Sequence, residues 1–402
     1  MEVRKDRLHR LTATTFKGIE MHSAALDTQL FMKMPIHCDE TGSNGIVYFK
    51  DVQPHPLTLD DWLDFSDSKD LKIKIAGVVA GKPEWDKTFP PVGNRFQADF
   101  AVGPSLNNSC FALVKGGWVP IFYAFSKGNI IADRNLVSEI QARFSNGEMS
   151  SERERNDFLD YICDKNCSCT IHTISYALES NERKLPSSEK IIEQHRAALK
   201  TLSRALPHVK TWPESDSDLE HFLALADKFR EYFSQGMRLL IKLAPLVINS
   251  PARNKRVDRW KEMAQIARAE NISVSHIVFL ACISATSAEQ GFNPAQKLIK
   301  PKAIYTEEDA YNSMYDLFLI MLTNVLQTQA PELKVTLVTR DKNLAFFWMG
   351  LTFADPSSPG QQMIGLHQKL LPVSELELKE LAVILGEGRV NTSWEMPAQP
   401  KY

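Results

Sequence analysis

The sequence predicts an α/β protein with a parallel-sheet core, a helical insertion and an N-terminal β-rich domain. Short β-branched or apolar runs alternate with amphipathic stretches in residues 118–190 and 303–355, which is typical of βαβ units. Residues from about 188 to 300 show only the three- and four-residue apolar spacing of helices. We therefore interpret this middle stretch as an insertion that divides the core.

Residues 1–117 are predicted to form the β-rich domain. Proline, glycine and asparagine separate several short extended stretches there, and we recognise no catalytic constellation among them. The candidate strands are Gln29–Met34, Gly45–Lys50, Leu71–Val79, Arg95–Val102 and Phe111–Lys115.

Residues 118–190 are predicted to form the first part of the core. Strand-like and helix-like stretches alternate here, and Ser175 has the side chain of a helix N-cap. Strands are expected at Val119–Phe125, Asn129–Ala132 and Cys169–Ile174, and helices at Leu136–Phe144, from Ser151 onward and at Tyr176–Arg183.

Residues 191–302 are predicted to be the helical insertion, and we see no strand in them. The helices are expected at Ser188–Leu206, Ser217–Val247 and Arg256–Ala288.

Residues 303–390 are predicted to complete the core, and residues 391–402 to form a loose tail. The pattern Thr306–Asp309 is typical of a capping box, which would open a helix running to Gln329. Pro331 would end that helix, and Lys334–Thr339 would follow as a strand.

Composition limits the classes of function that we consider. The chain has 402 residues and a net charge of −2, so any nucleic-acid contact must come from local basic patches. Six cysteines are scattered along it, which we interpret as free thiols of a cytoplasmic protein. No apolar run approaches 18 residues and residues 1–18 show no signal-peptide pattern, so we expect no membrane partner.

Two short runs carry the functional prediction. Ile130–Ala132 and Val335–Thr339 are each predicted to be a strand buried on both faces, and Asp133 and Asp341 follow them. In an open α/β sheet, sites form at the carboxyl ends of the strands. We therefore expect both carboxylates to face one cleft.

A third acid, Asp316, lies in a predicted helix that is apolar on every side. A buried carboxylate is costly unless a cation accompanies it. Asp316 precedes Gln329 by 13 residues, roughly 20 Å of helix, which matches the length of the following strand. This spacing would bring Asp316 level with the acids at the strand ends, so we prefer it to Asp309. Glu179, after the strand Cys169–Ile174, is the expected fourth member.

Four carboxylates in one cleft repel one another unless divalent cations neutralise them. Hard oxygen ligands suit Mg²⁺ or Mn²⁺ and not zinc. Such an ion would activate a water and stabilise charge on a scissile phosphodiester, so the pattern predicts metal-dependent phosphodiester hydrolysis.

The runs Asn129–Glu139, Ile174–Glu179 and Leu337–Leu344 resemble the opening, second acidic and last acidic elements of PIN-domain ribonucleases. The resemblance covers roughly residues 118–190 and 303–355. It implies that Asp133, Glu179, Asp316 and Asp341 hold the metal ions, with Thr339 supporting them. We expect Asn135, Asn312 and Arg340 to support the acids or contact substrate, and Glu139 to lie at the surface or behind them.

The family's toxin-like members suggest a regulated toxin or phage-defence role, cutting RNA or alternatively DNA. A regulatory protein partner and an oligomeric state are left open. Three alternatives remain: a non-catalytic PIN-like scaffold in a larger complex, a phosphatase-like enzyme acting on small nucleotides, and strand-end Asp residues that only cap helices.

Two further patterns are ambiguous. Cys163, Cys167, Cys169 and His172 could suggest zinc, but their spacing favours buried thiols. The basic run Arg253–Lys261 could grip a nucleic-acid backbone or form a solvated loop.

Overall fold

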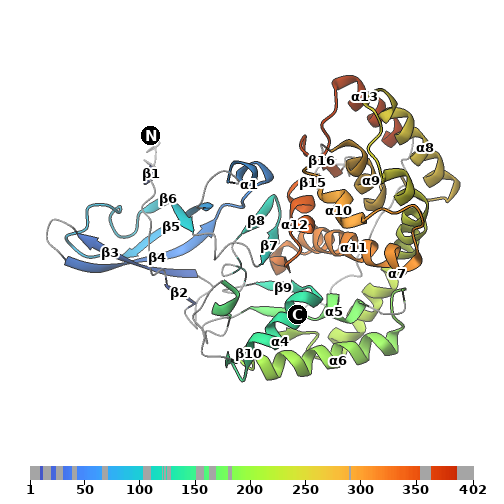
Figure 1. Ribbon diagram of the computed structural model, residues 1–402. Helices are drawn as coiled ribbons and strands as arrows, with labels where there is room; N and C mark the ends of the chain where they lie inside the picture. The colour runs from blue at the N-terminus through green and yellow to red at the C-terminus, as the bar shows by residue number, and fades with distance from the viewer. Residues whose placement is uncertain are drawn as a thin grey trace, which may run out of the picture. The chain divides into compact units, whose positions relative to one another are not determined.

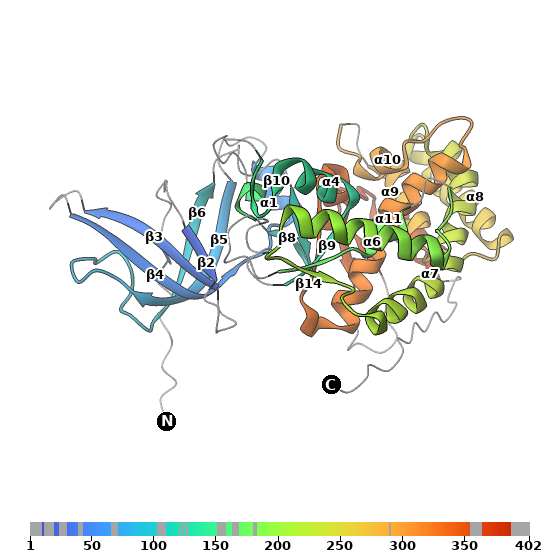
Figure 2. The same ribbon diagram turned by 90° about the horizontal axis from the view of Figure 1, so that it is seen from below.

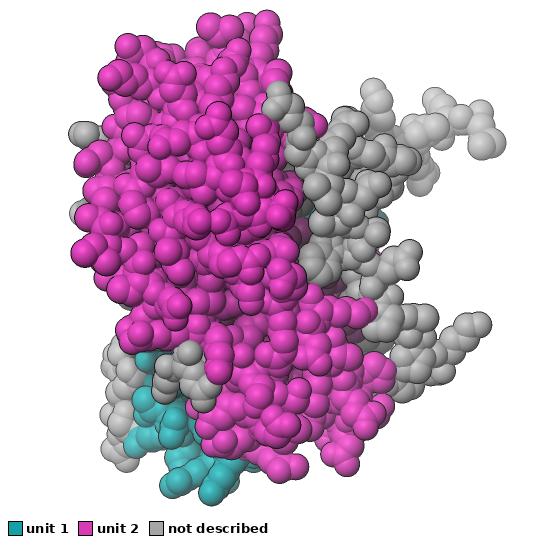
Figure 3. Space-filling model, turned by 90° about the vertical axis from the view of Figure 1, so that its right-hand side faces the viewer, with its two compact units in different colours: residues 1–173, 197–212, 336–340 teal, residues 174–196, 213–335, 341–402 magenta. Residues whose placement is uncertain are grey.

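A computed structural model shows a mixed α/β protein that packs as two compact units (Figure 3). Unit 1 comprises residues Met1–Thr173, Ala197–Trp212 and Thr336–Arg340, and unit 2 comprises Ile174–Arg196, Pro213–Val335 and Asp341–Tyr402. The structure describes residues 10–11, 20–23, 30–38, 43–65, 71–102, 110–119, 121, 124, 128–150, 158–162, 169–179, 183–288, 291–353 and 364–386.

The first sheet of unit 1 has the strand order β1-β6-β5-β4-β3-β2 (Figure 1). Neighbours are antiparallel, except that β1 runs parallel to β6. Phe49, Phe89 and Phe96 pack together on its buried side, with ring centroids 4.4–6.4 Å apart. Its strands are β1 (Arg10–Leu11), β2 (Glu20–Ser23), β3 (Leu30–Cys38), β4 (Ser43–Pro54), β5 (Leu71–Gly81) and β6 (Arg95–Val102), and α1 (Leu59–Phe65) lies between β4 and β5 in sequence.

The second sheet of unit 1 has the order β13-β12-β9-β14-β7-β8 and is mixed. Strands β9, β12 and β13 are parallel, whereas β7 is antiparallel to both β14 and β8. The sequence predicts a domain boundary after residue 117, but the β7–β8 hairpin spans that position. Residues on both sides of the predicted boundary therefore belong to the same sheet. Its strands are β7 (Phe111–Val114), β8 (Gly117–Val119), β9 (Asn129–Ala132), β12 (Thr170–His172), β13 (Lys210–Trp212) and β14 (Val335–Thr339).

Helix α4 (Arg134–Arg143) lies beside β9 in both ribbon views, and α6 (Ser188–Ala205) runs near α4 (Figure 2). Leu136, Val137 and Ile140 form the buried stripe of α4, at the spacing of an amphipathic helix. The hairpin β10 (Phe144–Ser145) and β11 (Glu148–Met149) follows α4, and the short 3-10 helix η1 spans Phe158–Tyr161.

Unit 2 is mainly helical. Phe318 of α11 contacts Phe229 and Phe233 of α7, with ring centroids 5.2 and 5.7 Å apart, and all eleven residues of α9 are buried. The helices are α5 (Ile174–Leu178), α7 (Asp216–Leu243), α8 (Arg256–Ala269), α9 (Ile277–Ser287), α10 (Pro294–Ile299), α11 (Glu307–Gln329), α12 (Lys342–Met349) and α13 (Glu375–Gly386); the 3-10 helices are η2 (Ala244–Val247), η3 (Arg253–Lys255) and η4 (Pro331–Leu333), and the strands are β15 (Leu351–Phe353) and β16 (Ile364–Leu366).

Several sequence-based expectations are confirmed in the described residues. Strand β9 has the expected bounds, and β14 begins one residue later than expected. Thr306 and Asp309 form the predicted capping box at the start of α11, which ends at Gln329 as expected. Cys110, Cys169 and Cys282 are buried thiols that form no disulfide.

Other expectations are wrong, each for a local reason. Ser175 lies inside α5 and is not its N-cap. The expected helix Arg256–Ala288 is two helices, because Asn271 between them has a left-handed φ of 55°. Strand β13 lies within the stretch expected to be wholly helical. Of the expected strand Val119–Phe125, Val119 alone is in a strand, while Ile121 and Ala124 are helical and the others lie outside the described residues.

The helix expected to open at Ser151 and the tail at 391–402 lie outside the described residues. Among the helices that the structure describes, none combines the length and the apolar character needed to cross a membrane.

Candidate functional site

Asp133 is placed by two neighbouring strands of the second sheet. It follows β9, in which Ile130, Ile131 and Ala132 are fully buried. Its backbone N–H donates to the Val338 carbonyl oxygen, 3.3 Å away, so the carboxyl end of β9 lies beside that of β14. This is the sheet edge at which the sequence predicts a site.

The Asp133 side chain is 6% exposed, and both of its oxygens accept hydrogen bonds. Oδ1 accepts from the Leu136 backbone N–H at 2.7 Å, which makes Asp133 the N-cap of α4. Oδ2 accepts from the hydroxyl of Thr339 at 2.7 Å. The structure thus brings together Asp133 and the threonine expected to support it, and fixes the orientation of the carboxylate.

A pocket of about 430 Å³ in unit 1 is lined, among the described residues, by Asn135, Ser138, Glu139 and Arg340. Asn135 and Arg340 were expected to contact substrate or support the acids. Ser138 was not predicted to be a site residue. Its position three residues after Asn135, on the same face of α4, is the signal that could have identified it.

Behind this pocket lies an ion-pair series that the sequence does not reveal. Arg340 Nη1 contacts Glu139 Oε2, and Arg143 Nε lies 2.5 Å from Glu139 Oε1. Arg143 Nη1 in turn lies 2.9 Å from Oδ1 of Asp160, whose side chain is fully buried. Asp160 is 17 residues from Arg143 in sequence, beyond the range of helix-periodicity arguments.

Asp341, Glu179 and Asp316 belong to unit 2. Asp341 is the N-cap of α12, and its Oδ1 accepts from the backbone N–H groups of Asn343 and Leu344 at 2.7 and 3.1 Å. Asp341 is half-buried. Its capping role is the ordinary structural explanation for an acid at this position.

The elements that carry Glu179 and Asp316 are joined by two tyrosines of α11. Tyr315 donates its hydroxyl to the Ser175 carbonyl oxygen, and Tyr311 donates to that of Leu178 at 3.3 Å. Glu179 directly follows α5, and Asp316 directly follows Tyr315. The structure therefore ties α5 to the part of α11 that carries Asp316.

Burial differs among the acids of unit 2. Asp316 is half-buried, although the apolar surroundings predicted full burial, and Asn312 is exposed. Glu179 is half-buried as a residue, and its Oε2 oxygen is shielded from solvent.

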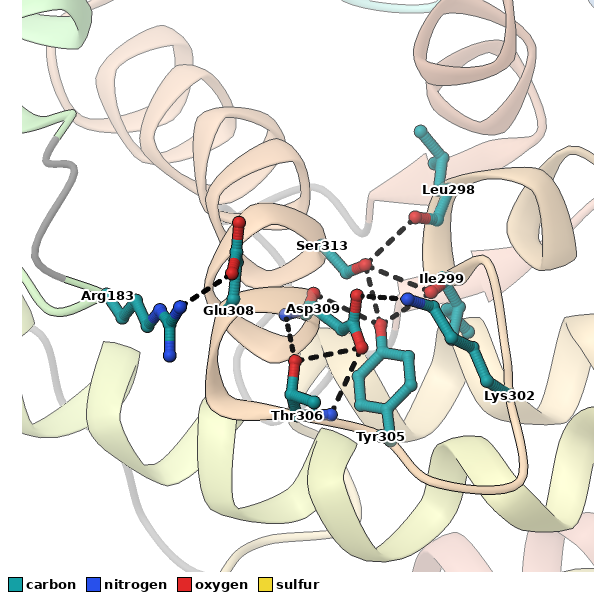
Figure 4. A network of polar contacts seen from close by, with 9 residues as sticks. All are labelled: Arg183, Leu298, Ile299, Lys302, Tyr305, Thr306, Glu308, Asp309 and Ser313. Atoms are coloured by element: carbon teal, nitrogen blue, oxygen red, sulfur yellow. Dashed lines mark hydrogen bonds and ion pairs between the residues drawn. The ribbon is translucent and has the colours of Figure 1, made fainter.

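Asp309 has a structural role at the start of α11 (Figure 4). Its Oδ2 accepts from the N–H and the hydroxyl of Thr306, and its Oδ1 lies 2.7 Å from Lys302 Nζ. The hydrogen bond from Lys302 holds the pKa of Asp309 below its ordinary value. These contacts explain the presence of an acid at this position, and the preference for Asp316 as the ligand from this helix stays a prediction.

The ambiguous pattern of cysteines and a histidine has a structural explanation. The His172 ring lies tilted against Trp212, with ring centroids 4.9 Å apart, and its Nε2 lies 2.9 Å from Asn129 Oδ1. Burial lowers the pKa of His172 to about 4. Cys169 is a buried thiol, and Cys163 and Cys167 lie outside the described residues.

Across the described ranges, no group of three or more His, Cys, Asp or Glu side chains is arranged to hold a metal ion.

The basic run Arg253–Lys261 is paired within unit 2. Arg253 and Arg256 contact Glu377, with nitrogen–oxygen distances of 3.7 and 3.2 Å, and Lys261 lies 2.8 Å from Glu380. These pairs attach α8 to α13 and compensate much of the positive charge that could attract a nucleic acid.

No family model, curated protein or solved structure matches the chain.

Proposed function

We propose that the chain is a divalent-metal-dependent nuclease that hydrolyses phosphodiester bonds in RNA, with DNA as the alternative substrate. One observation carries the proposal: the buried carboxylate of Asp133 lies at the carboxyl end of β9, fixed by Thr339 of the adjacent strand. A side chain held in this way is pre-organised, as a metal ligand must be. Asn135 and Arg340, on the elements that carry this pair, line a pocket.

The proposed donors are Asp133, Glu179, Asp316 and Asp341. All are carboxylates, and a set of hard oxygen donors fits Mg²⁺ or Mn²⁺. A carboxylate oxygen can accept more than one contact, so the hydrogen bonds to Asp133 are compatible with cation binding. When bound, the cation would orient a water and stabilise charge on the scissile phosphate.

The remaining roles belong to the chain's own side chains. The Thr339 hydroxyl holds Asp133 Oδ2, and the N–H of Leu136 holds Oδ1, so the carboxylate cannot turn away from the sheet edge. Arg340 and Asn135 supply hydrogen-bond donors at the pocket, where they would contact the phosphates of the bound strand.

The test is cleavage of end-labelled RNA and single-stranded DNA with Mg²⁺, with Mn²⁺ and with a chelator. We expect cutting only with metal, and a loss of at least 100-fold in rate for Asp133→Asn and Asp341→Asn, on the order of the loss when a metal-organising group is removed. Asp227→Asn is the matched control, since it removes the same charge from an exposed pair with Arg230. Equal cutting by parent and both site variants would end the assignment.

A binding module without catalysis is the second candidate. It is favoured by one observation, that Asp133 and Asp341 both cap helices and so have structural reasons to be present. Isothermal titration with Mn²⁺ separates the candidates. The nuclease must give a saturable heat of Mn²⁺ binding, of either sign, that Asp133→Asn diminishes, whereas a module of this kind binds its partner without the ion.

A further inference from the structure

Four charged side chains of unit 1 form a series that leads from the interior to the pocket. Their side-chain exposures are 0% for Asp160, 10% for Arg143, 23% for Glu139 and 38% for Arg340. The sign of the charge alternates at each step. The four formal charges therefore sum to zero, and the two outermost groups, Glu139 and Arg340, both line the pocket.

The series restricts the position of Glu139. Asp160 is fully buried, and a buried carboxylate is held in place by its partner because separation of the pair is costly. Arg143 in the last turn of α4 meets both acids, contacting Asp160 through Nη1 and Glu139 through Nε. Glu139 then holds Arg143 with one oxygen and Arg340 with the other.

Arg340 is consequently a cation whose contact with Glu139 is backed by the buried Arg143–Asp160 pair. A guanidinium carries several N–H donors in a planar fork that matches phosphate. Ser138 and Asn135 add a hydroxyl and an amide at the same pocket. Orienting the guanidinium before binding reduces the entropy lost when an anion arrives.

We propose that this pocket is a subsite for a phosphate group of a single-stranded nucleic acid, and that Asp160, Arg143 and Glu139 are positioning residues that direct Arg340 into it. The inference rests on the proposed nuclease function for its choice of ligand. It adds to that function a binding subsite for phosphate and the side chains that position Arg340 in it.

Fluorescence anisotropy with labelled single-stranded RNA in the presence of a chelator measures this subsite without any metal-dependent step. Arg340→Gln is expected to weaken binding roughly 10- to 100-fold, as for loss of a hydrogen bond between charged groups. It should also lower the slope of log affinity against log salt by about 0.7. The affinity of Arg340→Lys should fall between those of the parent and Arg340→Gln. Arg238→Gln is the matched control, because the Arg238 side chain is 48% exposed and pairs only loosely with Glu231, 3.6 Å away.

Double variants test the support. If Arg143 acts through Arg340, Arg143→Gln weakens RNA binding. The double variant with both substitutions then binds RNA no more weakly than Arg340→Gln alone. If Arg143 is merely structural, the unfolding temperature falls while the affinity of the folded protein is unchanged. Should Arg143→Gln fail to fold, Arg143→Lys decides. The ammonium keeps the charge but lacks the planar fork that meets both acids, so this variant weakens binding if Arg143 positions Arg340 and leaves the affinity unchanged if it does not.

The outcomes separate this inference from the nuclease itself. Metal-dependent cleavage together with an unchanged affinity and salt slope for Arg340→Gln overturns the subsite and leaves the nuclease standing. RNA binding that depends on Arg340, with no cleavage in any metal, supports the subsite and contradicts the nuclease.

Discussion

Replacing Asp133 by alanine tests the pair of hydrogen bonds that fixes the carboxyl end of β9. Asp133 accepts from Leu136 N–H and from the Thr339 hydroxyl, each at 2.7 Å, and Thr339 is 1% exposed. Loss of an Asp N-cap costs about 1 kcal/mol, and a buried hydroxyl deprived of its acceptor costs roughly 1–3 kcal/mol. We expect Asp133→Ala to lower the free energy of local opening by about 2–4 kcal/mol.

Amide hydrogen exchange is the suitable assay, because a chain with two compact units need not unfold in a single transition. Peptides that cover α4 and β14 should exchange faster in Asp133→Ala, while those from α8 in unit 2 should not change. Asp133→Asn is the control variant. Its amide oxygen still accepts from Leu136 N–H, and the Thr339 hydroxyl can accept from the amide nitrogen, so we expect a loss below about 1 kcal/mol.

A loss below about 0.5 kcal/mol in Asp133→Ala would refute this reasoning, since the cap alone is worth that much. Thr339→Val supplies a second check through a double-mutant cycle. The two side chains share one buried hydrogen bond, so the double variant should be less destabilised than the sum of the single variants. Strict additivity would show that they do not act as a pair.

Two further predictions concern buried groups that are not among the proposed metal ligands. Burial lowers the pKa of His172 to about 4, so the unfolded state, with a pKa near 6.5, binds the proton first. The free energy of unfolding should therefore fall by up to about 3 kcal/mol as pH drops from about 6.5 to about 4. Hydrogen exchange of β12 should become faster over this pH range. In His172→Phe this dependence on pH should disappear. Gly236→Ala should cost about 1–3 kcal/mol, because the added Cβ would overlap Met314 Sδ and lie 2.8 Å from His276 Cε1. Its effect should be faster exchange in α7 and α11, and unchanged exchange would contradict the close packing at Gly236.

Local sequence patterns were sufficient to predict some elements. β14 is buried at every position, so its apolar run predicts it well, and Thr306 opens α11 with its own capping box. Sheet membership was harder to predict. Phe111–Val114 is a strand as expected, but its pairing with β14 joins segments more than two hundred residues apart.

The missed features depend on distant partners. Three residues, Lys210–Trp212, form β13 because they pair in register with β12, and their own sequence carries no alternation long enough to indicate a strand. Asp160 is buried because Arg143 accompanies it, and nothing in the residues around Asp160 predicts that partner. Both cases show long-range pairing deciding what local propensity leaves open.

The strand-end acids illustrate why position alone cannot establish chemistry. Asp133 satisfies the requirements of a helix cap and of a pre-organised metal ligand at once, because its two oxygens are each fixed by one donor. The two roles respond differently to one substitution. Asparagine keeps the cap and loses the charge, so unchanged hydrogen exchange combined with lost cleavage identifies a ligand. If exchange and cleavage both stay as in the parent, Asp133 is a cap, and the structural role is sufficient to explain its place at the sheet edge.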